Sequence, residues 1–267
     1  MPELPEVETT RRRLEPLVVG KSFERVIIRT PKLRLPVPPE LERVLPGQTV
    51  RRLERRGKYL LLYCDAGCLL IHLGMTGVLR LVPATTPAGR HDRLDLVFAD
   101  GPILRLHDPR KFGTVLWVAG DPRAHPLLAG IGPEPLTDDF GGNYLFDASR
   151  SRRVAVKLFI MNAGVVAGVG NIYANEALFR ARIRPDRSAG SLDRQECGRL
   201  AGAVKEVLAE SVATGSTYRV AEDEVGYHPL DFSVYGRGGE TCHACGGPLE
   251  AVRLGNRSTV FCPRCQR

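Results

Sequence analysis

Cys242-His-Ala-Cys245 and Cys262-Pro-Arg-Cys265 are the stretches that decide the fold at the end of this chain. Two residues separate the thiols within each pair, and residues 246–261, which include several glycines, separate the pairs. Each short pair forms a knuckle, and the long interval folds as a hairpin that brings both knuckles to one ion. The sequence therefore predicts a zinc ribbon that binds one Zn²⁺ per chain through Cys242, Cys245, Cys262 and Cys265.

Two structural disulfides are the alternative use of these four thiols. The chain starts Met-Pro-Glu-Leu-Pro-Glu, without an apolar secretory segment. A protein without such a segment is expected in a reducing cytoplasm, where thiolates persist as metal ligands. We therefore expect a cytoplasmic protein and favour zinc over disulfides.

Length and charge narrow the class of partner. The chain has 267 residues, enough for more than one domain, and none of its apolar runs approaches a membrane span. Its formal net charge of +8 at pH 7 favours polyanions as partners. Many soluble proteins are basic, so this charge indicates nucleic acid only together with a located site.

The periodicity of apolar residues changes along the chain. Residues 5–18 predict a helix that stops at Gly20, and residues 22–118 contain short β-rich runs typical of a sandwich or barrel. A proline-rich boundary over 131–136 precedes helical patterns, and an acidic, irregular stretch covers 220–230. The expected strands are 26–28, 59–63, 69–73, 78–82, 94–98, 103–106 and 114–118, and the later helices are about 150–162, 171–183 and 193–213.

Gly168-Val-Gly-Asn171 leads directly into a helical pattern. Free N–H groups and the positive end of a helix dipole favour an anion at such a site, and the Asn171 side chain can donate to a phosphate. A dinucleotide fingerprint is the rival, but Tyr173 replaces its third glycine and no strand precedes the loop. Glycines that let two helices pack closely explain the loop about as well as phosphate binding does.

Pro2 becomes a secondary amine at the chain terminus if Met1 is removed. An α-amino group titrates near about 8, so part of it is neutral at cellular pH. A neutral amine can attack a sugar C1′ to form an iminium, and Glu3 beside it could move protons. Proline and glutamate also favour helix starts, which from these residues alone is the better explanation.

Six motifs favour the role of Pro2 as a nucleophile over its role as a helix-start residue, because together they resemble the formamidopyrimidine-DNA glycosylase family over essentially the whole chain. Each is weak alone, but six in the family's order are specific. They are Pro2-Glu-Leu-Pro-Glu-Val-Glu8, Gly57-Lys-Tyr59, His72-Leu-Gly-Met-Thr-Gly77, His107-Asp-Pro-Arg-Lys-Phe-Gly113, Gly168-Val-Gly-Asn-Ile-Tyr173 and the four-cysteine tail.

The resemblance implies an α+β chain. It has an N-terminal helix with a two-layer antiparallel β-sandwich, then a helix-two-turn-helix domain that ends in the zinc ribbon. The corresponding domains are residues 1–130, 131–236 and 237–267. The implied protein is a monomeric bacterial repair enzyme that acts on damaged double-stranded DNA of the nucleoid, with no membrane and no small-molecule cofactor.

The implied chemistry is excision of oxidised purines followed by strand scission. Pro2 attacks C1′ and forms a Schiff base, and Glu3 protonates the opening sugar ring. Lys58 and Arg257 are proton donors in the β- and δ-elimination steps. Without the resemblance, Lys58 is a solvated charge at a strand end and Arg257 a plain phosphate contact.

The resemblance also assigns the DNA contacts. Met75, Arg110 and Phe112 fill the void left by the extruded nucleotide, a task that suits apolar wedges and a hydrogen-bond donor. In isolation Met75 and Phe112 would be read as core residues, and Arg152 as part of a solvated helix face. The residues assigned to the DNA backbone are His91, Arg110, Arg152, Lys157, Asn171 and Arg257.

Two positions depart from the family's pattern. Residues 218–227 are acidic where a glycine-containing loop helps to choose the lesion, and Asn162 stands where a carboxylate is common. The preferred lesion is therefore open. The alternatives are an endonuclease VIII-like glycosylase for oxidised pyrimidines and a catalytically silent, zinc-dependent DNA-binding protein; Met75 and the motif around Phe112 favour the purine enzyme.

Overall fold

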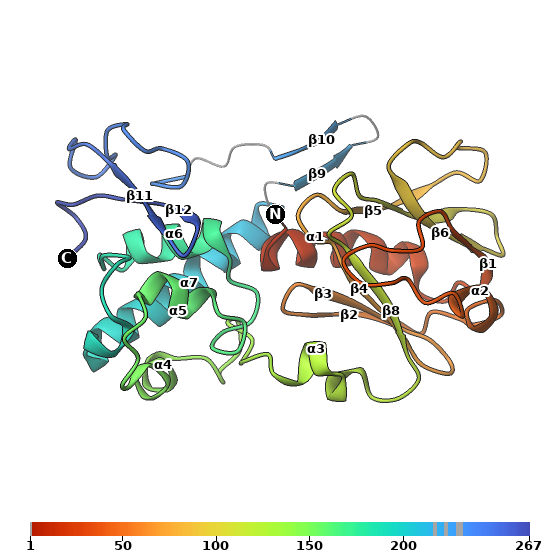
Figure 1. Ribbon diagram of the computed structural model, residues 1–267, viewed down its shortest axis with the longest axis horizontal. Coiled ribbons are helices and arrows are strands. Elements are labelled where there is room, and N and C mark those ends of the chain that lie inside the picture. Colours follow the sequence, from red (N-terminus) through yellow and green to blue (C-terminus); the bar gives the residue numbers. More distant parts are fainter. Residues whose placement is uncertain (1, 216–217, 222–223, 228–231) are drawn as a thin grey trace. The chain divides into compact units, whose positions relative to one another are not determined.

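The structure is a computed structural model that describes residues 2–215, 218–221, 224–227 and 232–267, and for residues 216–231 no side chains are described. The chain forms two compact units (Figure 1). Unit 1 comprises Met1–Ala129 and Tyr218–Tyr227, and unit 2 comprises Gly130–Thr217 and His228–Arg267. The three-domain division expected from the sequence stays a prediction.

Unit 1 is a helix packed with two four-stranded antiparallel sheets. Helix α1 (Leu4–Val18) precedes the strands, and α2 (Leu41–Val44), the 3-10 turn η1 (Pro122–Ala124) and α3 (Pro126–Ala129) are short. One sheet has the order β1 (Phe23–Ile28), β6 (Asp92–Phe98), β7 (Ile103–His107), β5 (Val78–Val82). The other has the order β2 (Arg52–Arg56), β3 (Tyr59–Tyr63), β4 (Cys68–His72), β8 (Thr114–Val118).

Alternate residues of both sheets meet in one apolar core. Leu60 and Leu62 of β3 share it with Leu94 and Leu96 of β6, as the period of two along a strand requires. Val7 of α1 belongs to the same core. The packing of two antiparallel sheets over one core makes unit 1 a sandwich rather than a barrel.

Unit 2 contains four longer helices and the C-terminal hairpin. These are α4 (Gly142–Ser149), α5 (Val156–Met161), α6 (Asn171–Arg180) and α7 (Arg194–Ala213), with the 3-10 turn η2 (Ala189–Ser191) before α7. The hairpin pairs β11 (Glu250–Leu254) with β12 (Arg257–Phe261). Phe179 of α6 packs against the small core of this hairpin.

The predicted α+β class is confirmed, and several details differ from the sequence-based expectation, among them the end of α6 at Arg180 and the short helices α2 and α3. The helix expected over 150–162 begins only at Val156, because Ser151 takes a left-handed backbone (φ 60°) after α4. Strand β2 and helix α4 were not expected. Where an irregular stretch was expected, β9 (Tyr218–Ala221) pairs with β10 (Glu224–Tyr227), and the rest of that stretch lies outside the described residues.

Among the described residues, none of the helices combines the length and the apolar character that a membrane span requires.

Candidate active site and metal centre

The start of α1 buries two carboxyl groups next to Pro2. Pro2 is buried, and Glu3 and Glu6 are 1% and 0% exposed. Glu3 is the N-cap residue, and its amide donates to Oε2 of Glu6 at 2.7 Å within a capping box. Pro5 lies in the first turn, where a missing N–H is tolerated. The terminal motif therefore starts the helix and at the same point gathers an imino acid and two acidic groups.

Lys58 lies in the turn between β2 and β3, beside a neutral histidine. It follows Gly57, whose left-handed backbone (φ 55°) makes the tight turn. Burial and then the positive charges of Lys58 and Arg34 lower the pKa of His72 to about 4, so this imidazole is neutral at pH 7. Nδ1 of His72 accepts the Gly74 amide at 3.0 Å, which leaves the ring proton on Nε2.

The three predicted void-filling residues lie on two adjacent loops, which we call the wedge loops: residues 73–77 with Met75, and 108–113 with Arg110 and Phe112. A Cβ at Gly74 would stand 2.3 Å from the carbonyl carbon of Phe112, so the loops approach as closely as glycine allows. Phe112 is 40% exposed, and the Arg110 guanidinium lies 4.7 Å above its ring. An exposed aromatic ring next to an exposed arginine suits insertion between bases.

Asp108 fixes both wedge loops. Its buried carboxylate accepts the Thr76 hydroxyl at 2.9 Å and the Gly113 amide at 2.8 Å. One acceptor group thus ties together the loops that carry Met75 and Phe112. Asp108 had no predicted role, and its position inside the His-Asp-Pro-Arg motif is the sequence signal that points to it.

His91 is joined to the same loops. The Asp108 amide donates to the His91 carbonyl at 2.9 Å, and the Arg93 guanidinium lies 3.1 Å from Nδ1 of His91. Partial desolvation and then the nearby Arg93 and Arg90 lower the pKa of His91. The neutral form of the His91 imidazole is therefore favoured more than in an isolated histidine.

Asn171 begins α6, directly after the glycine loop. Gly168 is left-handed (φ 80°) and Gly170 is the N-cap residue, without a side chain to cap the helix. The Asn171 Oδ1 is buried and has no hydrogen-bond partner within the described part of the chain. The start of a helix favours an anion, and the anion site that the sequence suggested here stays a prediction.

The other predicted contacts of unit 2 have contrasting environments. Arg257 is exposed at the start of β12, directly after the turn of the hairpin. Arg152 is exposed in the connection between α4 and α5, where its carbonyl accepts the Ser188 hydroxyl at 2.8 Å. Lys157, on α5, is 0% exposed, and its ammonium donates to Ser258 and Thr259 of β12.

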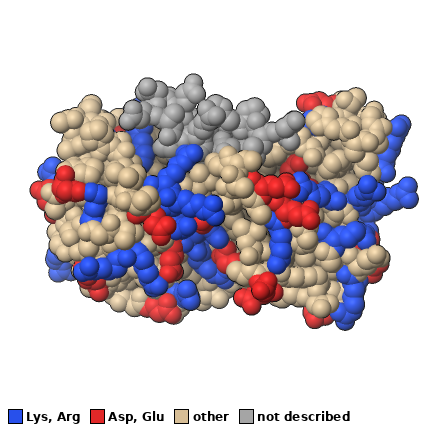
Figure 2. Space-filling view, turned by 180° about the vertical axis from the view of Figure 1, so that it is seen from behind, with Lys and Arg blue, Asp and Glu red and all other residues tan. Residues whose placement is uncertain are grey.

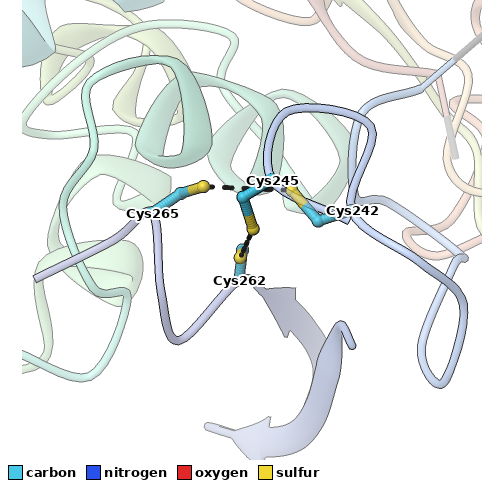
Figure 3. A group of neighbouring side chains, drawn as sticks. All are labelled: Cys242, Cys245, Cys262 and Cys265. Atoms are coloured by element: carbon cyan, nitrogen blue, oxygen red, sulfur yellow. Dashed lines mark hydrogen bonds between the residues drawn. The ribbon is translucent and has the colours of Figure 1, made fainter. Parts of the chain in front are cut away.

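The four predicted zinc ligands converge (Figure 3). Their sulfur atoms all lie within 4.8 Å of one another, with 3.5 Å between Cys245 and Cys262 and 4.0 Å between Cys242 and Cys265. A tetrahedral ion with bonds of about 2.3 Å needs sulfurs about 3.8 Å apart, so this set fits zinc. The Gly247 amide and then the thiols of Cys262 and Cys265 lower the pKa of Cys245 to about 7. No two of the seven cysteines are joined by a disulfide, and the convergence of these four sulfurs favours the metal site.

Asn162, the departure noted in the sequence, ends α5. Its Oδ1 accepts the Gly164 amide at 2.9 Å, and its backbone carbonyl accepts Val165 and Val166. An aspartate would make the same side-chain contact, so the observed role is to shape the turn before the glycine loop.

Basic side chains are not segregated on the face shown in Figure 2, where lysine and arginine alternate with acidic residues. Many arginines are paired, such as Arg11 and Arg55 with Glu8. Burial opposes the charge of Glu8, but hydrogen bonds from Arg11 and Arg12 outweigh it and lower the pKa of this carboxyl. The net charge is therefore weaker evidence for DNA binding than the geometry of the individual loops.

Three family models match successive parts of the chain. They are the formamidopyrimidine-DNA glycosylase N-terminal domain over residues 1–115, the formamidopyrimidine-DNA glycosylase H2TH domain over residues 131–222, and the zinc finger found in FPG and IleRS over residues 239–267.

Full-length relatives share the same description. Formamidopyrimidine-DNA glycosylase of Geobacter metallireducens is 68% identical over the whole of both chains. The crystal structure of the MutM (Fpg) protein of Thermus thermophilus is 41% identical with a TM-score of 0.88, over 99% of this chain and 98% of that one. Lactococcus lactis Fpg in complex with DNA containing an abasic site is 33% identical with a TM-score of 0.91, over 99% of each chain.

Proposed function

Because this chain belongs to the formamidopyrimidine-DNA glycosylase family, we propose that Pro2 is the nucleophile with which it removes oxidised purines, 8-oxoguanine and formamidopyrimidines, from double-stranded DNA. The chain is a base-excision repair glycosylase with one structural Zn²⁺. The observation that carries the assignment of Pro2 is the buried start of α1, which combines Pro2 with the carboxyl groups of Glu3 and Glu6.

The first chemical step forms a bond between the Pro2 nitrogen and C1′ and breaks the bond between C1′ and the base. Burial disfavours the protonated form of an amine, so the surroundings of Pro2 favour the nucleophilic form once Met1 is absent. The sugar ring opens as its oxygen receives a proton from Glu3, and the product is an iminium. The departing base takes up a proton.

Strand scission follows from the acidity of C2′ next to the iminium. Loss of a C2′ proton expels the 3′ phosphate by β-elimination, with Lys58 as the proton donor. A second elimination expels the 5′ phosphate, with Arg257 as the donor. His72 is neutral, so it adds no positive charge beside the ammonium of Lys58.

Base extrusion is the task assigned to the wedge loops. Removing a nucleotide from the stack costs a few kcal/mol, and side chains that fill the gap recover part of it. Met75 and Phe112 fill the gap and Arg110 hydrogen-bonds the unpaired base opposite. Their support is the close contact of the two loops at Gly74 and the shared carboxylate of Asp108.

Backbone contacts position the duplex without reading its sequence. We assign them to His91, Arg110, Arg152, Asn171 and Arg257, but not to Lys157, whose side chain is buried. The protein acts as a monomer on nucleoid DNA in the bacterial cytoplasm. Preference between lesions depends on residues 218–227, whose side chains lie outside the described part of the chain.

Borohydride trapping tests the nucleophile. Reduction of the iminium should give a covalent adduct with DNA that contains 8-oxoguanine or an abasic site. A chain that keeps one uncleaved residue before Pro2 should give no adduct while it binds the same duplex with unchanged affinity, because its proline nitrogen is an amide. Pro2→Gly should lose most trapping. Undiminished trapping in the extended chain would refute the assignment of Pro2, and an oxidised-pyrimidine substrate preferred over both purine lesions would refute the substrate class.

A further inference from the structure

Lys157 carries a charge in the interior of unit 2. Its side chain is 0% exposed, and Nζ donates to the Ser258 carbonyl at 2.8 Å and to Oγ1 of Thr259 at 2.7 Å. A buried ammonium is tolerated only where several acceptors surround it. In this position Lys157 is engaged with β12 of the zinc ribbon, and its ammonium has no exposed surface to offer a phosphate.

The Thr259 hydroxyl connects the Lys157 ammonium to the backbone of Arg257. Thr259 is also 0% exposed, and its hydroxyl donates to the Arg257 carbonyl at 3.3 Å. A hydroxyl has one proton to give and lone pairs to accept with, so Oγ1 can serve both neighbours at once. The order of bonds is therefore Lys157 ammonium, Thr259 hydroxyl, Arg257 backbone.

Backbone conformation and one further contact fix the hairpin turn just before Arg257. Gly255 and Asn256 both have left-handed backbones, φ 53° and 61°, as the tightest hairpin turns require. A Cβ at Gly255 would stand 2.9 Å from Leu158, the residue after Lys157, so the turn is seated on α5. The side chain of Arg257 projects from a backbone that α5 holds at both the turn and Thr259.

The opposite end of β12 is tied to α6. Oδ1 of Asn175 accepts the Val260 amide at 2.9 Å, and Nδ2 of Asn175 donates to the Asn171 carbonyl at 2.5 Å. Asn175 thus holds β12 against α6, the helix that begins with Asn171, and Lys157 holds β12 against α5. The spacing between Arg257 and Asn171 is set by these buried polar contacts inside one unit.

We infer that Lys157 and Thr259 are positioning residues that set the place of Arg257 for the second elimination, and that Lys157 makes no contact with DNA. The inference rests on the role of Arg257 in the proposed function. Without the Thr259 hydroxyl, the Arg257 carbonyl and the Lys157 ammonium both lose a partner, and the backbone under Arg257 shifts. Chemistry at Pro2 and the first elimination do not depend on this attachment.

The first experiment compares products on DNA with a preformed abasic site, using zinc-loaded, full-length protein in single turnover. Thr259→Val removes the hydroxyl at nearly constant shape and should lower the ratio of δ- to β-elimination product about tenfold, with unchanged borohydride trapping. Thr259→Ser keeps the hydroxyl and should restore the wild-type ratio. Adding Thr259→Val to Arg257→Ala should lower the ratio no further, because both changes remove the same contribution.

The outcomes separate the inference from its premise. An unchanged ratio in Arg257→Ala refutes the role of Arg257 and the inference with it. A lowered ratio in Arg257→Ala together with a wild-type ratio in Thr259→Val refutes the inference alone. Equal losses in Thr259→Val and Thr259→Ser would also refute it, since they would show a packing effect rather than the hydroxyl.

The second experiment asks whether Lys157 contacts phosphate and needs no catalysis. In the Arg257→Ala background, Lys157→Met should leave the slope of log affinity against log salt concentration unchanged. A lysine that neutralises a phosphate would instead reduce the slope by about 0.9. A reduction of that size, with zinc content and melting temperature equal to those of Arg257→Ala, would overturn the positioning role.

Discussion

His72 shows how one buried side chain can support a site without taking part in its chemistry. It lies at the end of β4, its ring faces Tyr59 across the sheet at 4.7 Å, and its Nδ1 accepts the amide of Gly74 in a wedge loop. A protonated ring could not accept that bond and would repel Lys58. The neutral state therefore serves both Lys58 and the loop of Met75.

The lowered pKa of His72 predicts a stability that depends on pH. The unfolded chain takes up a proton near pH 6.5 and the folded chain only near pH 4, so stability is complete above about pH 6.5 and is lost as pH falls toward 4. Between pH 7 and pH 5, wild type should lose about 2 kcal/mol more unfolding free energy than His72→Gln. Urea titrations at both pH values measure this; both proteins carry the same zinc site, so its own acid sensitivity cancels. Equal losses would contradict the neutral assignment.

For single residues, the sequence predicts the metal ligands well, but it predicts burial and hydrogen-bond partners poorly. The four cysteines could be assigned because their spacing alone defines a tetrahedral site. Lys157 was expected to contact DNA, but its side chain is buried because α5 packs on β12. The spacing of residues along the chain does not reveal this packing. Asp108 went unassigned for the same reason, since the two loops it joins are separated by β5, β6 and β7.

At the scale of elements, the close contact between the wedge loops requires that residue 74 has no side chain. Gly74→Ala would place a methyl group 2.3 Å from the backbone of Phe112 and would also strain a left-handed backbone (φ 67°). We expect a loss of about 3 kcal/mol or more of unfolding free energy, and a larger loss of excision at 8-oxoguanine than of scission at an abasic site. Urea unfolding and cleavage assays on the two substrates measure both effects.

Gly20→Ala is the matched control for that change. Gly20 is also left-handed (φ 86°), but apart from its chain neighbours no atom of the described residues lies within 4 Å of the position of its Cβ. It should cost only about 1–2 kcal/mol and leave excision unchanged. Equal costs at the two glycines would show that backbone strain, and not the contact between the loops, limits Gly74.

Elements with a strong apolar period were predicted closely, and charged or short ones were not. The strands over 59–63, 78–82 and 114–118 have the expected bounds, because alternating leucines and valines fill one core. Strand β2, with sequence Arg-Leu-Glu-Arg-Arg, buries only Leu53 and lies at the edge of its sheet, where charges are favoured. Helix α4 starts at two glycines, which have a low helix propensity, so the sequence did not predict a helix there. One of these glycines packs against Gly198 of α7, and this tertiary contact explains why glycine occurs at the start of the helix.

For the molecule as a whole, zinc and the sandwich core should be independent. None of the four ligands contributes to the core of unit 1, whereas Cys242 and Cys262 belong to the core of the ribbon. Zinc removal, or Cys245→Ser, should therefore unfold the ribbon and lower DNA affinity more than tenfold, because metal binding and ribbon folding are one equilibrium.

Hydrogen exchange supplies the internal control for this prediction. Amides of β11 and β12 should lose protection without zinc, while those of β3 and β4 keep it. Anisotropy titrations with a labelled abasic duplex give the affinity. Wild-type affinity in zinc-free protein would contradict the prediction, and so would loss of protection in the sandwich.

Unit 1 is discontinuous in sequence, and this limits how the protein can be divided for expression. Tyr218–Tyr227 belongs with Met1–Ala129, although the segments on either side of it belong to unit 2. A gene fragment cut after Ala129 therefore omits part of the first unit, and the complementary fragment carries two strands, β9 and β10, away from their own unit. Biochemists who want the whole of unit 1 would need to graft residues 218–227 back through a new linker.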